Sequence, residues 1–369
     1  MTNQPISAPE VASGPVRYSA RAIIAAVVGV HAVYGAYWAD RLVPTVVELA
    51  LARDPSQVPV LAAIWPVWTR VLGIAGLEPL LAGRALSIVC ATLAILTMFR
   101  LLRGFAGDRV VAAGACLLFV AFPPITASWA LATPHALSAL LVTALLALSL
   151  AEQSRGRFIM AGVSAVLLSA LHPLGLILTA LALVPAAAMP TAGRGIKWRV
   201  MAGGFLVLGL GAMLSGVLRP PADIDVSNLG QTGFVAAILL PYVLIWTVLV
   251  LSAASLRSAA VRAQLGTGGC AASLAAMIGV PAWAVGAGGL LAPGEVLTSF
   301  AYVLPLAVIG AVPLAIWVRF VMPTVKSLAA WILFPVIMYS GFWLALGPVG
   351  LDRFPYAFRT EAPAPGIVP

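Results

Sequence analysis

Long apolar stretches, separated by short polar segments, recur along almost the whole chain. Stretches of roughly 17 to 25 residues match the length that an α-helix needs to cross the hydrocarbon core of a bilayer. The pattern predicts an all-α, polytopic transmembrane bundle of about eleven segments. The expected segments are Ala22–Trp38, Arg84–Leu102, Val110–Phe122, His135–Ala151, Phe158–Leu171, Leu174–Ala188, Val200–Leu218, Phe234–Leu256, Gly268–Leu290, Leu297–Val318 and Ser327–Leu346.

Two of these segments, Phe158–Leu171 and Leu174–Ala188, are short for complete membrane spans, and they meet at His172-Pro173. Basic clusters flank the pair on both sides, so the chain has to enter the membrane and return. We expect a tight hairpin of two short helices, with the polar backbone at the turn sheltered by neighbouring protein.

Composition supports a membrane protein. Hydrophobic residues make up 62% of the chain and charged residues only 9%, whereas a soluble domain carries about 25% charged residues. A soluble fold could not cover such an apolar core. The three cysteines show neither CxxC nor Cys/His spacing, so we interpret them as small apolar residues in helix packing.

The net charge of +9 would suggest nucleic acid as a partner in a soluble protein, but the basic residues do not form one patch. They fall in short clusters between apolar segments, which is how helices are oriented during insertion. With the N-terminus in the cytoplasm, 14 of the 21 basic residues lie inside. These are Arg17, Arg21, Arg100, Arg103, Arg109, Arg155, Arg157, Arg194, Lys197, Arg199, Arg257, Arg262, Arg319 and Lys326.

The sequence therefore predicts an integral protein of a bacterial inner membrane, with a cytoplasmic N-terminus, an exterior C-terminus, lipid contacts and no nucleic-acid partner. Residues 1–20 are expected to be a disordered cytoplasmic tail, because they are polar and rich in Pro, Ser and Ala. Residues 21–190 form the first membrane module, 191–346 carry further transmembrane helices, and 347–369 form a short exterior tail.

The longest exterior connection, residues 39–83, is predicted to stay at the bilayer boundary. One helical face carries Arg41, Thr45 and Glu48, and another carries Leu42, Val46, Leu49 and Arg53. This division indicates a helix lying along the membrane surface. Further on, Trp65 and Trp68 are typical of interfacial anchors.

Ionisable side chains are almost absent from the middle of the apolar segments. His31 is the main exception, and it shares a helical face with Tyr34 and Trp38. It could line a polar cavity below the exterior surface, or it could be a neutral histidine hydrogen-bonded to a neighbouring helix. Asp40 follows the first segment directly. It could accept a proton from an attacking hydroxyl, or it could be the N-cap of the surface helix.

The order of several features resembles the GT-C superfamily of membrane glycosyltransferases, in its mannosyltransferase-like and aminoarabinose-transferase-like branches. The features are an acidic residue after the first helix, the large loop with Ile64-Trp65-Pro66-Val67-Trp68, Gly83-Arg84-Ala85-Leu86-Ser87, Gly104-Phe105-Ala106-Gly107-Asp108, Phe122-Pro123-Pro124, Ala132-Thr133-Pro134-His135-Ala136-Leu137 and Gly156-Arg157. The resemblance covers Arg21 to Pro190. It rests on the order and spacing of these motifs, because no single motif is specific.

The resemblance implies transfer of a sugar from a polyprenyl-phosphate carrier to an acceptor on the exterior face. Asp40 would then be the general base on the acceptor hydroxyl. Arg84 would bind the carrier phosphate, because a guanidinium offers several donors to phosphate oxygens. Alternatively, Arg84 is an interfacial arginine that snorkels from a helix end. His31, Glu48 and His135 complete the set of candidate substrate-binding residues.

Two departures from the family keep other functions open. The family commonly has an acidic residue where this chain has His135, so a divalent metal is a doubtful cofactor and no metal ligands are assigned. It also often appends a soluble domain, whereas only Gly347–Pro369 follow the last segment here. Two alternative functions are a catalytically inactive subunit that assembles with another membrane protein and a transporter of a lipid-linked substrate.

Overall fold

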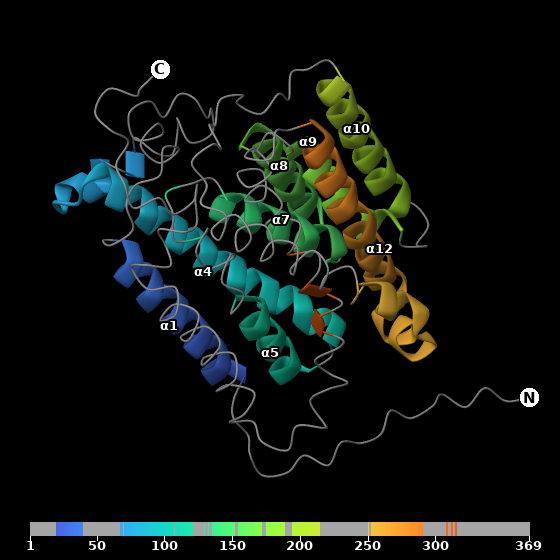
Figure 1. Ribbon diagram of the computed structural model, residues 1–369, viewed down its shortest axis with the longest axis horizontal. Helices are drawn as coiled ribbons and strands as arrows, with labels where there is room; N and C mark the ends of the chain where they lie inside the picture. The colour runs from blue at the N-terminus through green and yellow to red at the C-terminus, as the bar shows by residue number, and fades with distance from the viewer. Residues whose placement is uncertain are drawn as a thin grey trace, which may run out of the picture.

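The computed structural model is built of α-helices, and it contains no strand among the residues that it describes (Figure 1). The described residues are 20–39, 67–68, 70–106, 108–120, 129, 132, 135–151, 154–171, 175–188, 194–214, 250, 252–290, 308, 311–312 and 314–315. The labelled helices are α1 (Ala20–Ala39), α4 (Pro79–Ala106), α5 (Arg109–Val120), α7 (His135–Leu150), α8 (Arg155–Leu171), α9 (Gly175–Ala187), α10 (Arg194–Leu214) and α12 (Ala259–Leu290). The expected all-α class is confirmed.

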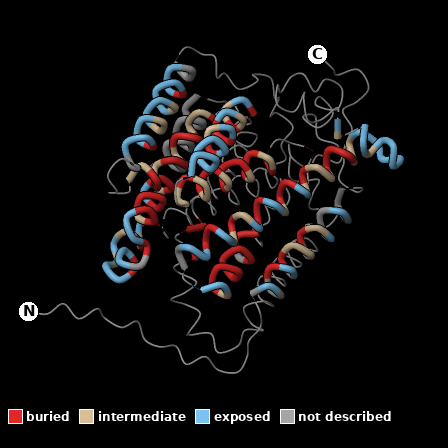
Figure 2. Tube along the Cα trace, turned by 180° about the vertical axis from the view of Figure 1, so that it is seen from behind, coloured by how far each residue is buried: buried red, intermediate tan, exposed pale blue. Residues whose placement is uncertain are grey.

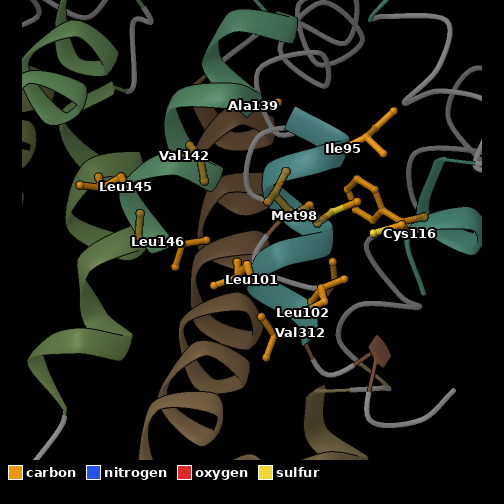
Figure 3. Packing of buried hydrophobic residues seen from close by; sticks show 14 of the residues in the cluster. Ile95, Met98, Leu101, Leu102, Cys116, Ala139, Val142, Leu145, Leu146 and Val312 are labelled. Carbon is orange, nitrogen blue, oxygen red and sulfur yellow. The ribbon is translucent and has the colours of Figure 1, made fainter. Parts of the chain in front are cut away.

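Helix α7 joins two groups of helices. On one side, α1, α4 and α5 pack against one another, and α4 also packs along α7. On the other side, α7 contacts the pair α8 and α9, and α9 in turn contacts α10 and α12 (Figure 1). In Figure 3, the labelled residues of α4 and α7 ascend in number in the same direction, so these two helices run parallel.

Within the described residues, one helical stretch, Pro79–Gly104 in α4, is long and apolar enough to cross a membrane. Three shorter apolar stretches, His135–Leu150, Gly175–Ala187 and Leu265–Met277, accompany it. Much of the chain that carries the other expected spans, notably 215–249 and 316–369, lies outside the described residues. The total of eleven segments therefore stays a prediction.

Helix α4 begins at Pro79, five residues before the expected start at Arg84. Proline suits the first turn of a helix, because its missing N–H would have no partner there. Before it, residues 70–74 are helical and end in a Schellman motif. Gly76 takes a φ of 79°, and the N–H of Leu77 donates to the carbonyl of Leu72 at 3.1 Å. The indole N–H of Trp68 then donates to the carbonyl of Ala82 at 2.8 Å, which holds this segment against the start of α4.

The expected short pair is present as α8 and α9, which pack against each other. The two helices approach closely at Gly175, where a Cβ atom would stand 2.0 Å from the carbonyl oxygen of Leu168. One turn further along α9, the hydroxyl of Thr179 donates to the carbonyl of Ala165 at 3.4 Å. Glycine is thus required at the start of α9, because any side chain would push the two helices apart.

Helix α12 does not begin where the sequence suggested. It starts at Ala259 instead of Gly268, and it is interrupted by Gly266, whose φ of 61° and ψ of −175° are not helical. Only glycine adopts this backbone conformation without strain. The kink allows the first turns of α12 to change direction, and Leu265 and Ala272 on either side of it are both buried.

A single apolar core connects both groups of helices (Figure 3). Met98 and Leu102 from α4, Cys116 from α5 and Leu146 from α7 all belong to it, together with Val312 from the C-terminal part of the chain. Buried positions are concentrated along α5, α7 and α9, and Figure 2 shows buried and exposed positions alternating along the other helices. Residues of the N-terminal and later parts of the chain therefore pack in one core.

Candidate functional site

Helix α1 presents one buried stripe to its neighbours. Ile24, Val27 and His31 follow one another at helical spacing and are all buried, whereas Val33 on another side is largely exposed. Because α1 packs against α4 and α5, the stripe faces these two helices. His31 is therefore held inside the protein, at 0% exposure.

The imidazole of His31 contacts an aromatic residue from a distant part of the chain. The ring of Trp129 stands edge-on to it, with the ring centroids 6.0 Å apart and the planes at 84°. On its other side, Trp129 lies 6.2 Å from the ring of Phe119 in α5. Neither ring nitrogen of His31 nor the indole N–H of Trp129 has a hydrogen-bond partner in the part of the chain that the structure describes. Three polar atoms are thus gathered in an apolar setting.

Arg84 lies in the second turn of α4, with its side chain turned into the protein. It is 1% exposed, and Ser87, on the same face one turn later, is buried too. An arginine that snorkels from a helix end would keep its head group in water, so the burial of Arg84 does not fit that alternative. Its guanidinium, which offers several hydrogen-bond donors, is enclosed near the start of α4.

His135 is the first residue of α7, as the sequence suggested, and it is buried. Ser138 follows one turn later, is completely buried, and its hydroxyl has no hydrogen-bond partner among the described residues. Because α7 runs parallel to α4 and packs along it, the polar first turns of both helices lie toward the same end of the bundle.

Three of the five candidate residues thus come from helices that pack against one another, in the order α1, α4 and α7. Asp40, Glu48 and the expected surface helix lie outside the described residues. Trp129 is the residue that sequence reasoning missed. It falls between two expected segments, where periodicity gives no signal, and only its long-range contact with His31 singles it out.

No group of three or more His, Cys, Asp or Glu side chains that could hold a metal ion occurs among the described residues. Comparison of the chain with protein-family models, with curated proteins and with solved structures finds no match. The GT-C resemblance consequently rests on the residues quoted above.

Proposed function

We propose that this chain is an integral membrane glycosyltransferase that takes a sugar from a polyprenyl-phosphate carrier and passes it to an acceptor on the exterior face. The observation that carries the proposal is the buried charge of Arg84 in the second turn of α4. A guanidinium offers several donors in a planar fork, and the oxygens of a phosphate match that geometry.

Exposed apolar surface supports the membrane part of the proposal. On α8, Ile159, Val163 and Val166 form an exposed apolar stripe at helical spacing. On α10, Val200 and Val207 are each 69% exposed. Soluble monomers rarely expose apolar patches of this extent, whereas lipid-facing helices require them. These faces are suited to acyl chains.

The roles in the reaction follow from the positions along the chain. Arg84 binds the carrier phosphate and stabilises the charge that develops on it as the glycosidic bond to the sugar breaks. Asp40 follows directly on α1, which packs against α4, and it is proposed to take the proton of the acceptor hydroxyl as that oxygen attacks the anomeric carbon. His31, Glu48 and His135 are proposed to contact the bound substrate.

The test compares transfer from polyprenyl-phosphate sugars by the wild type and by variants of equal membrane abundance. Asp40→Asn keeps size and capping ability but cannot take a proton at neutral pH, so transfer should fall by about 10²- to 10⁴-fold. Asp54→Asn in the same connection is its matched control and should leave the rate unchanged.

Arg84→Lys probes the phosphate contact separately. Lysine keeps the charge but not the two-pronged geometry, so the KM for the donor should rise by about tenfold or more. Arg70→Lys, at an exposed arginine in the helical residues 70–74 that precede α4, should leave this KM unchanged. Undiminished transfer by Asp40→Asn would reduce Asp40 to a helix cap. A wild type that is inert with every carrier would favour an inactive subunit or a transporter.

A further inference from the structure

The first turns of α8 and α10 and the last turn of α9 meet at one end of the helix bundle. The ring of Phe158 in α8 lies 5.3 Å from that of Trp198 in α10. The guanidinium Nε of Arg199 in α10 donates to the carbonyl of Ala187, the last residue of α9, at 2.8 Å. Three helix ends are therefore fixed together, at the end predicted to face the cytoplasm.

Basic residues gather at this end of the bundle. Arg155, Arg157, Lys197 and Arg199 are all exposed there, and Glu152 is the acidic residue nearest to them in the sequence. Two helices also begin at this end, and the N-terminus of a helix carries a partial positive charge that attracts anions. Side chains and backbone thus favour an anionic ligand.

Apolar side chains are exposed directly beside these charges. Ile159 and Met160 follow the arginines of α8, and Ile196 and Val200 bracket Lys197 in α10, each more than half exposed. A basic cluster next to an exposed apolar strip suits a molecule with a charged head and an apolar tail. Figure 2 shows how far the exposed positions continue along the outer helices.

Trp198 supplies an independent indication of a ligand. It is 1% exposed, yet its indole N–H has no acceptor among the described residues. A buried indole N–H usually finds a partner, because leaving it unpaired costs the full desolvation of the group. An anionic oxygen between the starts of α8 and α10 would provide the missing acceptor.

We propose that this end binds the headgroup phosphate of an anionic phospholipid, with the acyl chains along the exposed strips of α8 and α10. The insertion rule explains why basic residues gather on the cytoplasmic side. It does not explain the convergence of two helix N-termini, an apolar strip and an unpaired buried N–H. The site is distinct from the proposed sugar-transfer site near the starts of α4 and α7.

The test uses the full-length protein in neutral detergent and measures the binding of phosphatidylglycerol and phosphatidylcholine by native mass spectrometry. The wild type should retain phosphatidylglycerol preferentially. A juxtamembrane basic residue contributes about fivefold to the binding of anionic lipid, so Arg155→Gln with Lys197→Gln should weaken it by about tenfold or more. The matched control is Arg100→Gln with Arg103→Gln, which removes two exposed charges at the C-terminal end of α4. It should change binding by less than about threefold.

Trp198→Phe keeps an aromatic ring beside Phe158 but loses the N–H together with part of the indole ring volume, and it should weaken phosphatidylglycerol binding severalfold. Glycerol 3-phosphate, which lacks acyl chains, should not compete at equal concentration. The proposal is overturned if the wild type shows no preference for phosphatidylglycerol, or if the two double variants lose equal affinity. An unchanged affinity of Trp198→Phe, or full competition by glycerol 3-phosphate, would equally contradict the site as described.

Discussion

The indole ring of Trp129 lies edge-on to the imidazole of His31, at 84° and with 6.0 Å between the ring centroids. Trp129 lies in the chain between α5 and α7, and His31 lies on the buried stripe of α1. The contact therefore ties the first helix to the segment that leads into α7. It also encloses polar nitrogen atoms for which the described part of the protein provides no partner.

A first prediction concerns the stability of this contact. His31→Leu removes two buried nitrogens that lack hydrogen bonds, and replacing such groups by apolar atoms of similar volume is close to neutral or stabilising. The thermal midpoint of the purified protein in detergent should therefore stay the same or rise. Val27→Ala, on the same stripe, is the control and should lower the free energy of unfolding by about 1 to 3 kcal/mol. A large loss of stability in His31→Leu would show that the imidazole has a partner.

The α8–α9 hairpin gives a second prediction. Gly175→Ala would place a Cβ atom 2.0 Å from the carbonyl oxygen of Leu168, so the helices must separate. We expect a loss of about 1 to 3 kcal/mol, as for other overpacked sites. Gly162→Ala in α8 meets nothing within 4 Å and should be neutral or slightly stabilising. Resistance to unfolding by SDS compares the two variants, and equal behaviour would contradict the close approach at Gly175.

A third prediction addresses the turn that precedes α4. Gly76 ends residues 70–74 in a left-handed conformation with a φ of 79°, which costs a residue with a Cβ about 1 kcal/mol. Gly76→Ala should therefore increase cleavage by a protease added from the exterior side. Gly73→Ala, three residues earlier and free of close neighbours, should not. Equal cleavage of the two variants would contradict the requirement for glycine at position 76.

The fourth prediction is topological. Reporter fusions after Arg155 and Arg194 should give the same cytoplasmic signal, because the start of α8 and the end of α9 lie at one end of the bundle. Fusions after Gly104, Arg262 and Met322 should also be cytoplasmic, and those after Arg53, Asp225 and Glu361 exterior. This prediction rests on the distribution of basic residues between the two sides of the membrane. Opposite signals at Arg155 and Arg194 would contradict the hairpin.

Local sequence determined the starts of four of the eight labelled helices, whereas α8, α10 and α12 begin three, six and nine residues before their expected positions. The expected starts of α1, α5, α7 and α9 lie within two residues of those in the structure. Apolar length and flanking polar residues are local properties, and a helix in an apolar environment satisfies its own backbone hydrogen bonds. The same reasoning misplaced the start of α4, because Arg84 was interpreted as the polar end of a helix that in fact begins at Pro79.

Tertiary structure alone decided which polar residues are enclosed. Nothing local distinguishes Arg84, which is 1% exposed, from Arg100, which is exposed on the same helix. Both α1 and α7 pack against α4, and the two arginines differ in whether neighbouring segments cover them. The pairing of His31 with Trp129 and the meeting of Phe158 with Trp198 are likewise contacts between separate segments. Helix periodicity fixes which residues share a face, but the burial of that face depends on the helices that pack against it.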